Sequence, residues 1–266
     1  VIGTGEASYE DFFEPLLAAH DPHAVEIFCY SDARRADDVT LRLQSLAHHW
    51  RSIAGIPEQA VADIIRRDRI DILVDLAGHT ADNRLTVFAR EPAPVQITYL
   101  GYPDTTGLST MHYRLTDALA DPPGPADALH SEKLLRLEGG FLCYQPPTGE
   151  DAPPPPDTTA FAPRPITFAS FNLHYKISDP AIQLWTAILD HCPTARLLIK
   201  SGGLGDASTC DRLRARFAAA GADITRLDLL DRLDSPADHL ALYRQVDIAL
   251  DTFPYNGTTT TCEALW

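Results

Sequence analysis

Residues 70–80 read IDILVDLAGHT, and this stretch decides the fold class. Its first part, 70–76, is rich in β-branched residues, which is typical of a strand buried inside a parallel sheet. A helical apolar pattern precedes it at 58–67, and a second apolar strand, VQITYL, follows at 95–100. Strands that alternate with helices in this way predict a parallel α/β sheet.

The same alternation runs through the rest of the chain. Before the deciding stretch, the sequence predicts a strand at 25–30 and a helix at 39–54. After it, strands are predicted at 166–170, 195–200, 224–230 and 246–250, and helices at 179–190, 212–220 and 237–244. Gly221 is expected to end the helix at 212–220, because glycine readily adopts the left-handed conformation found after helices.

A proline-rich segment separates the two runs of strands and helices. Eight of the 21 residues in 145–165 are proline, which removes backbone donors and excludes a central strand or a helix interior. We therefore predict an N-terminal α/β lobe over 1–144, an extended linker over 145–165 and a C-terminal α/β lobe over 166–266. Two such units suggest Rossmann-like lobes on either side of a cleft.

Composition narrows the function classes. The 266 residues carry a net charge of −15, with no basic stripe, so nucleic-acid binding is not expected. The five cysteines form no CxxC pair and are odd in number, which favours free thiols over disulfides or a zinc site. No apolar run reaches the ~18 residues of a membrane span, and no signal peptide opens the sequence. We expect a cytoplasmic protein without membrane contact.

Two loops of the N-terminal lobe follow predicted strands, where ligands bind in open α/β sheets. His79 and Thr80 come directly after the strand at 70–76, and YLGYPDTTG at 99–107 ends the next one. His79 thus stands where a site is expected. The glycines and the proline of 99–107 build a shaped loop, and its hydroxyls could contact a sugar or an acceptor. The alternatives are a locally bonded histidine and an ordinary turn.

Two segments of the C-terminal lobe suit a phosphate ligand. Lys176 follows the strand at 166–170 in FNLHYK, and DTFPYNGTTTTCEALW follows the strand at 246–250. The threonine run is expected to open a helix, whose free N–H groups and dipole attract phosphates. Glu263 falls one turn into that helix, where it could accept hydrogen bonds from ribose hydroxyls. Capping alone needs one threonine, whereas four stand here.

Taken together, four segments resemble a known family. IDILVDLAGHTADNR, FAREPAPVQITYLGYPDTTG, SFNLHYK and LDTFPYNGTTTTCEALW are similar, in the same order, to the catalytic region of the protein O-GlcNAc transferases, glycosyltransferase family 41, especially the bacterial ones. The resemblance runs from about residue 25 to residue 266. It implies the two-lobed GT-B fold, with the nucleotide held mainly by the C-terminal lobe.

The resemblance also implies roles for individual residues. Lys176 matches the lysine that contacts the diphosphate and stabilises the leaving group. Thr259 and Thr260 match the paired threonines of the phosphate site, and Glu263 matches the acidic position that binds ribose. His79 and Thr80 belong to the loop that faces sugar and acceptor, and Lys133 matches a further lysine near the site. His79 and Lys176 are the expected catalytic residues, with His79 the best-placed general base.

The implied reaction is inverting transfer of GlcNAc from UDP-GlcNAc to Ser or Thr hydroxyls of proteins. No metal or other cofactor is expected, because positive side chains and a helix dipole can neutralise the departing diphosphate. UDP-GlcNAc and acceptor proteins are the expected partners. Relatives usually carry tetratricopeptide repeats before this region and more of the second lobe after it, so we expect the second lobe to be truncated here.

Two alternatives stay open. The same fold can use another donor, such as UDP-glucose or a GDP-sugar. A non-catalytic relative that binds a sugar nucleotide or a protein is the other alternative. It is favoured because relatives carry a histidine soon after the first strand, whereas residues 4–11, TGEASYED, contain none.

Overall fold

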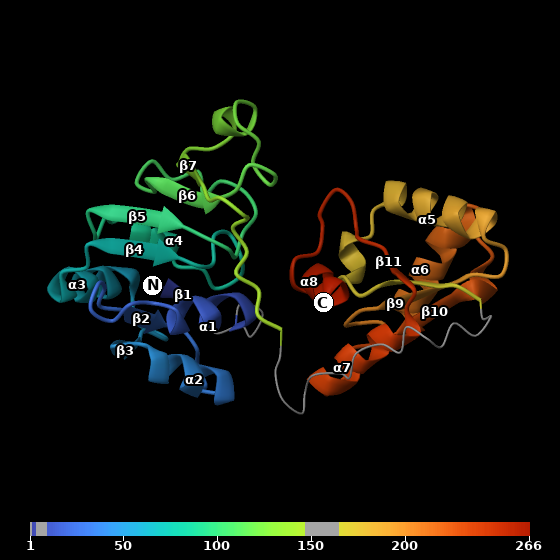
Figure 1. The fold of residues 1–266 in the computed structure, drawn as a ribbon, viewed down its shortest axis with the longest axis horizontal. Helices are drawn as coiled ribbons and strands as arrows, with labels where there is room; N and C mark the ends of the chain where they lie inside the picture. Colours follow the sequence, from blue (N-terminus) through green and yellow to red (C-terminus); the bar gives the residue numbers. More distant parts are fainter. Residues whose placement is uncertain (1, 4–9, 147–164) are drawn as a thin grey trace. The chain divides into compact units, whose positions relative to one another are not determined.

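The computed structural model describes residues 2–3, 10–146 and 165–266 (Figure 1). The chain divides into two compact units, Val1–Gln145 and Pro146–Trp266, which are described separately below. Most of the predicted linker, 147–164, lies outside the described residues, so the linker boundaries stay a prediction.

The first unit contains a seven-stranded sheet in which all neighbouring strands run parallel, in the order β3-β2-β1-β4-β5-β6-β7. The chain builds the sheet outward from β1 to β3, then returns to the middle and builds the other half from β4. The strands are β1 (Ile2–Gly3), β2 (Phe28–Ser31), β3 (His49–Ser52), β4 (Ile72–Asp75), β5 (Val95–Thr98), β6 (Tyr113–Thr116) and β7 (Lys133–Arg136).

Helices cover both faces of this sheet. Successive residues of β4 point to opposite faces, and each face packs against its own apolar cluster. Leu73 packs in one cluster with Ile65 and Phe88, and Val74 packs against the other cluster, which contains Leu17. The first cluster lies under α3 and α4, and the second lies under α1 and α2. The bounds are α1 (Glu10–Ala18), α2 (Asp38–Leu46), α3 (Glu58–Asp68) and α4 (Leu85–Phe88), with a 3-10 turn η2 (Ala126–Ala128).

The prediction of one helix over 39–54 is wrong. Helix α2 ends at Leu46, Ala47 adopts an extended backbone, and His49–Ser52 forms the edge strand β3. The His49 ring stacks on Phe28 of β2 at 4.1 Å between centroids. Trp50 therefore reaches the core from a strand. Its spacing from the preceding leucines only imitated a helical repeat, because tertiary pairing overrides local pattern.

The second unit contains a four-stranded parallel sheet in the order β10-β9-β8-β11. Its strands are β8 (Thr167–Ser170), β9 (Arg196–Lys200), β10 (Leu227–Leu230) and β11 (Ile248–Ala249). Its helices are α5 (Asp179–His191), α6 (Ala207–Ala219), α7 (Pro236–Leu242) and α8 (Thr259–Leu265), with 3-10 turns η4 (His174–Lys176), η5 (Ile224–Arg226) and η6 (Tyr243–Gln245).

Helices again lie on both sides of the sheet (Figure 1). Trp185 of α5 and Phe217 of α6 pack on one face, with ring centroids 6.5 Å apart, and Leu242 of α7 packs on the other. Two element starts in this unit differ from prediction by three residues or more. Helix α6 begins at Ala207 because the Asp206 side chain accepts a hydrogen bond from the Thr209 N–H. The strand expected from 224 begins at Leu227, after the turn η5.

Candidate functional site

The Asp251 carboxylate organises the loop between β11 and α8. Its Oδ1 accepts hydrogen bonds from the N–H groups of Thr252 (2.7 Å) and Gly257 (2.8 Å). Its Oδ2 accepts one from the Thr261 hydroxyl at 2.9 Å. The chain thereby folds back on itself, and the loop includes a cis peptide bond between Phe253 and Pro254.

Asn172, which follows β8, joins this loop to the sheet. Its Nδ2 donates to Asp251 Oδ1, and its Oδ1 accepts from the Thr260 hydroxyl, both at 2.9 Å. Asn172 is 6% exposed, so these bonds satisfy a buried amide. We call Asn172, Asp251, Gly257, Thr260 and Thr261 the Asp251 cluster. It links the carboxyl ends of β8 and β11, where ligands bind in α/β sheets.

Lys176 lies against the same loop. Its Nζ donates to the carbonyl oxygen of Asn256 at 3.2 Å and lies 3.9 Å from the ring centroid of Tyr255. Burial lowers the pKa of the Lys176 ammonium, and the charge of Asp251 partly opposes this shift. A carbonyl oxygen and an aromatic face thus hold the lysine beside the Asp251 cluster. Among the described residues, no carboxylate makes a direct ion pair with its ammonium group.

The threonine run opens α8, as predicted, with Thr259 as its first residue. Thr258, at the N-cap position, makes no side-chain capping bond. The hydroxyls of Thr260 and Thr261 bond to other members of the Asp251 cluster instead. Capping therefore does not explain the run, and the hydroxyls of Thr260 and Thr261 help to hold the loop.

Glu263 is directed toward α7. Its Oε2 lies 2.9 Å from His239 Nε2 and accepts a hydrogen bond from the Tyr243 hydroxyl at 3.1 Å. The carboxylate is therefore fixed by protein groups one turn into α8. Its predicted contact with ribose stays a prediction.

In the first unit, His79 bridges the two predicted loops. Its Nε2 lies 2.9 Å from the carbonyl oxygen of Thr106, and its ring meets that of Tyr102 edge to face at 5.2 Å. A carbonyl can only accept, so Nε2 carries the proton and the lone pair of a neutral ring lies on Nδ1. Thr80 donates its hydroxyl to the Ala77 carbonyl at 2.9 Å, which is a local turn contact.

Asp75 holds the His79 loop at the end of β4. The carboxylate is fully buried and accepts bonds from the N–H groups of Ala77 (3.1 Å) and Gly78 (2.9 Å) and from the Thr98 hydroxyl (2.9 Å). Burial raises the pKa of Asp75, and these hydrogen bonds oppose the shift. Asp75 was part of the predicted strand but not of the predicted site.

Glu132, which directly precedes β7, holds Thr105 and Thr106 of the loop 101–107. It is 4% exposed and accepts bonds from the Thr106 N–H (2.8 Å), the Thr106 hydroxyl and the Thr105 hydroxyl (2.7 Å). Burial alone raises the pKa of Glu132, but the bonds from Thr106 and Thr105 outweigh it and leave the pKa lowered. Lys133, the next residue, is exposed at the start of β7, and no hydrogen bond or ion pair joins it to His79 or Thr80 within the described residues.

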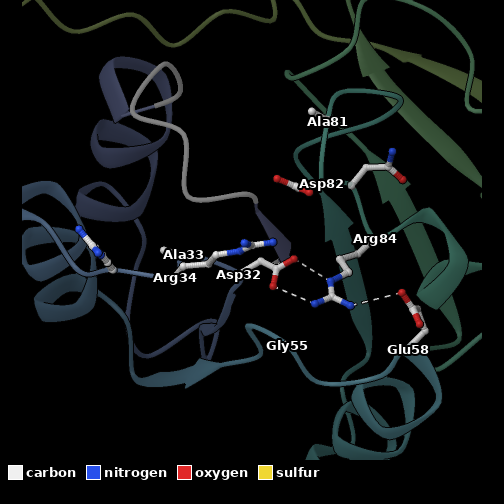
Figure 2. Close-up of a pocket in the computed structure, with 10 residues that line it drawn as sticks. Asp32, Ala33, Arg34, Gly55, Glu58, Ala81, Asp82 and Arg84 are labelled. Carbon is white, nitrogen blue, oxygen red and sulfur yellow. Dashed lines mark hydrogen bonds and ion pairs between the residues drawn. The ribbon is translucent and has the colours of Figure 1, made fainter.

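A pocket of about 600 Å³ lies in the first unit where the loops after β2, β3 and β4 meet (Figure 2). This is beside the point where the strand order reverses between β1 and β4, a usual ligand position in such sheets. Arg84 is bound there to both oxygens of Asp32, at 2.7 and 2.8 Å. Arg34 and Arg35 line the pocket from an exposed loop. These residues lack a recognisable spacing, so sequence reasoning missed them.

Within the described part of the chain, no group of three or more His, Cys, Asp or Glu side chains is arranged to hold a metal ion. None of the helices described there combines the length and apolar character needed to cross a bilayer.

Comparison with known proteins agrees with this architecture. Residues 11–144 match the family model described as Glycosyl transferase family 41. The chain therefore belongs to glycosyl transferase family 41.

Individual relatives cover more of the chain. It is 44% identical over 273 residues to a probable UDP-N-acetylglucosamine–peptide N-acetylglucosaminyltransferase SPINDLY of Oryza sativa subsp. japonica, across 99% of this chain and 28% of that protein. It is 32% identical over 261 residues to a probable enzyme of the same activity, SEC, of Arabidopsis thaliana, across 94% of this chain and 26% of that protein.

Among solved structures, a mutant O-GlcNAc transferase of Thermobaculum terrenum matches 100% of this chain with 39% identity and a TM-score of 0.88. The match confirms the predicted class, an α/β glycosyltransferase of the GT-B type with parallel sheets. The chain spans half of that structure and less than a third of the two curated relatives.

Proposed function

We propose that this chain contributes the catalytic region of an inverting glycosyltransferase that moves GlcNAc from UDP-GlcNAc to Ser or Thr hydroxyls of proteins. One observation carries the proposal: Lys176 lies beside the Asp251 cluster at the carboxyl ends of β8 and β11. The printed names of the relatives, which give UDP-N-acetylglucosamine and a peptide as substrates, support the choice of donor and acceptor.

The second unit supplies the donor side. The bond from the sugar C1 to the diphosphate oxygen breaks, so negative charge grows on the departing UDP. Lys176 is assigned to that charge, together with the backbone N–H groups of Thr259 and Thr260 at the start of α8, because fixed positive and hydrogen-bonding groups stabilise a developing anion without reorganising. In this proposal the reaction needs no metal, and Glu263 binds the ribose.

The first unit supplies the acceptor side. The acceptor oxygen forms its new bond to C1 on the face opposite UDP and loses its proton. His79 is assigned as the base, because the Thr106 carbonyl holds its proton on Nε2 and leaves the Nδ1 lone pair to accept one. Thr80 and Lys133 are assigned to sugar and acceptor contacts. We place the reaction in the cytoplasm, where the five free cysteines stay reduced.

Calorimetry with UDP tests the donor side. We expect the chain to bind UDP and Lys176→Ala to lose most of the affinity. Arg214→Ala removes a partly exposed cation of α6 that pairs only with Asp211 among the described ion pairs, and it is expected to leave UDP affinity unchanged. A folded chain that binds no UDP contradicts the proposal, and preferential binding of GDP indicates another donor.

Transfer from UDP-GlcNAc to a protein tests the acceptor side in the full-length protein. We expect His79→Gln to slow transfer while UDP affinity is kept. UDP binding without transfer by the wild-type protein indicates a non-catalytic sugar-nucleotide-binding relative.

A further inference from the structure

Lys200 is the third of the three lysines in the chain, and it is buried. It ends β9 with 8% of its surface exposed, and its Nζ lies 2.6 Å from Nδ1 of His239 on α7. The ring centroid of Phe171 lies 5.3 Å from the same nitrogen. A buried ammonium ordinarily pairs directly with a carboxylate. Here an imidazole ring takes that place.

His239 passes the contact on to α8. Its Nε2 lies 2.9 Å from Glu263 Oε2, and both side chains are largely buried, at 17% and 12% exposure. The Tyr243 hydroxyl lies 3.1 Å from the same oxygen and 3.0 Å from the carbonyl oxygen of Thr260. A continuous chain of polar contacts therefore runs from the end of β9, across α7, to the helix that carries Thr259 and Thr260.

When Lys200 is charged, only one protonation pattern of His239 satisfies these contacts. An ammonium group can only donate and a carboxylate can only accept, so the ring must accept at Nδ1 and donate at Nε2. A second proton on Nδ1 would direct an N–H at the Lys200 ammonium. A proton on Nδ1 alone would lose both contacts. Next to a charged Lys200, these contacts therefore require a neutral ring with its proton on Nε2.

We propose that Lys200 is a positioning residue of the nucleotide site: it holds His239 as the Nε2–H tautomer, and that N–H fixes the Glu263 carboxylate on α8. The steps from Lys200 to His239 and Glu263 stand on the contacts alone. Only the last step, from Glu263 to the nucleotide, rests on the proposed function.

The charges around Lys200, His239 and Glu263 are consistent with this arrangement. Burial lowers the pKa of Lys200, the charge of Arg232 adds to that shift, and the charge of Glu263 opposes it. Glu263 thus favours the ammonium without touching it, through the intervening ring. A lysine with a purely structural role could donate to any acceptor. Lys200 instead contacts one nitrogen of the His239 ring, and the other nitrogen of that ring contacts the Glu263 carboxylate next to the Asp251 cluster.

The ring nitrogens of His239 report the tautomer directly. Nitrogen-15 NMR of the chain at neutral pH, with the His239 signals assigned by their loss in His239→Gln, should show a protonated Nε2 and an unprotonated Nδ1. A wild-type ring that is protonated on Nδ1, alone or as well as on Nε2, overturns the proposal without any variant at Lys200.

Variants then test the cause. Lys200→Met keeps the length of the side chain and removes the donor, so the wild-type nitrogen pattern should be lost and UDP affinity should fall about tenfold. Lys200→Arg keeps a donor and should restore the pattern. Arg244→Met removes an exposed cation from η6, beside Tyr243. It should change neither the nitrogen pattern of His239 nor the UDP affinity. A Lys200→Met chain with the wild-type pattern overturns the proposal.

The two proposals fail separately. If the wild-type chain binds no UDP, the proposed function fails, but the nitrogen pattern still decides whether Lys200 sets the tautomer. If UDP binds and Lys200→Met changes the pattern without changing affinity, the positioning role in the nucleotide site is overturned while the proposed function stands.

Discussion

A Cβ atom on Gly257 would lie 2.3 Å from Oδ1 of Asn172, closer than side-chain atoms pack in proteins. The same atom would lie 2.7 Å from the Thr260 hydroxyl. The loop before α8 is therefore closed around a position without a side chain, and the bond between Asn172 and Thr260 depends on it.

Gly257→Ala should break that bond, because either Asn172 or the loop has to move. We expect UDP affinity to fall at least tenfold and the unfolding free energy to fall by ~1–3 kcal/mol. Calorimetry and denaturant unfolding measure the two effects. Gly202→Ala is the control, since a Cβ there meets nothing within 4 Å. Unchanged UDP binding by Gly257→Ala would show that the Asp251 cluster is not the phosphate site.

Lys176 should make UDP binding sensitive to alkaline pH. Burial lowers its pKa from the usual 10.5, so its charge is lost at a lower pH than that of an ordinary lysine. UDP affinity should therefore start to fall below pH 10.5. Calorimetry across this range on the wild type and on Lys176→Met separates this loss from ionisation of UDP itself, which affects both proteins equally. Parallel pH profiles of the two proteins would contradict the assignment.

Asp206 should stabilise the second unit only above acidic pH. Bonds from the Ser208 hydroxyl and the Thr209 N–H and hydroxyl lower its pKa from 3.8 to about 2. A lowered folded-state pKa means that the charged form favours folding, so this stability is complete above pH 3.8 and is lost as pH falls toward 2. Thermal unfolding of Asp206→Ala should show a lower midpoint than the wild type at pH 7, and the difference between the two midpoints should shrink as pH falls through about 2. Asp206→Asn keeps an acceptor and should lose less at pH 7.

Glu132 should matter for transfer but not for UDP. Glu132→Ala leaves the Thr106 N–H and two hydroxyls without their acceptor, which should lower the unfolding free energy of the first unit by ~1–3 kcal/mol. Transfer by the full-length protein should fall because the loop that bonds His79 is no longer held. Glu132→Gln keeps one acceptor oxygen, so its unfolding free energy and its transfer rate should lie between those of the wild type and Glu132→Ala. A loss of UDP affinity in Glu132→Ala would point to misfolding or to a different role for this loop.

Much of this fold could be predicted from the sequence. The helices at 58–67 and 179–190 and the strands at 70–76 and 95–100 have apolar patterns that tertiary contacts only reinforce. The segment 39–54 failed because β3 is an edge strand whose residues keep the spacing of a helix. Strand β6 was missed because its buried side chains Arg114 and Thr116 are polar. Strand β7 was missed because charged residues flank its two leucines.

The candidate site shows the same division. Motif residues such as Lys176 and Thr260 could be found because their charged or hydroxyl side chains belong to the segments that follow predicted strands in the sequence. Asp251 was read only as the start of a loop, and Asn172 as a neighbour of Lys176. Lys200 and His239 could not be found, because only the packing of β9 against α7 brings residues 39 positions apart into contact.

The Asp251 carboxylate has a consequence for the kinetics of binding. Its bonds to Thr252, Gly257, Thr261 and Asn172 order the loop when the unit folds. These groups therefore lose their conformational entropy when the unit folds, before a nucleotide arrives. The binding free energy of the nucleotide need not offset this loss. If the proposed diphosphate site is correct, a preorganised loop of this kind lets the ligand dock in one step, so the association rate should follow encounter with Lys176 rather than a slow rearrangement of the chain.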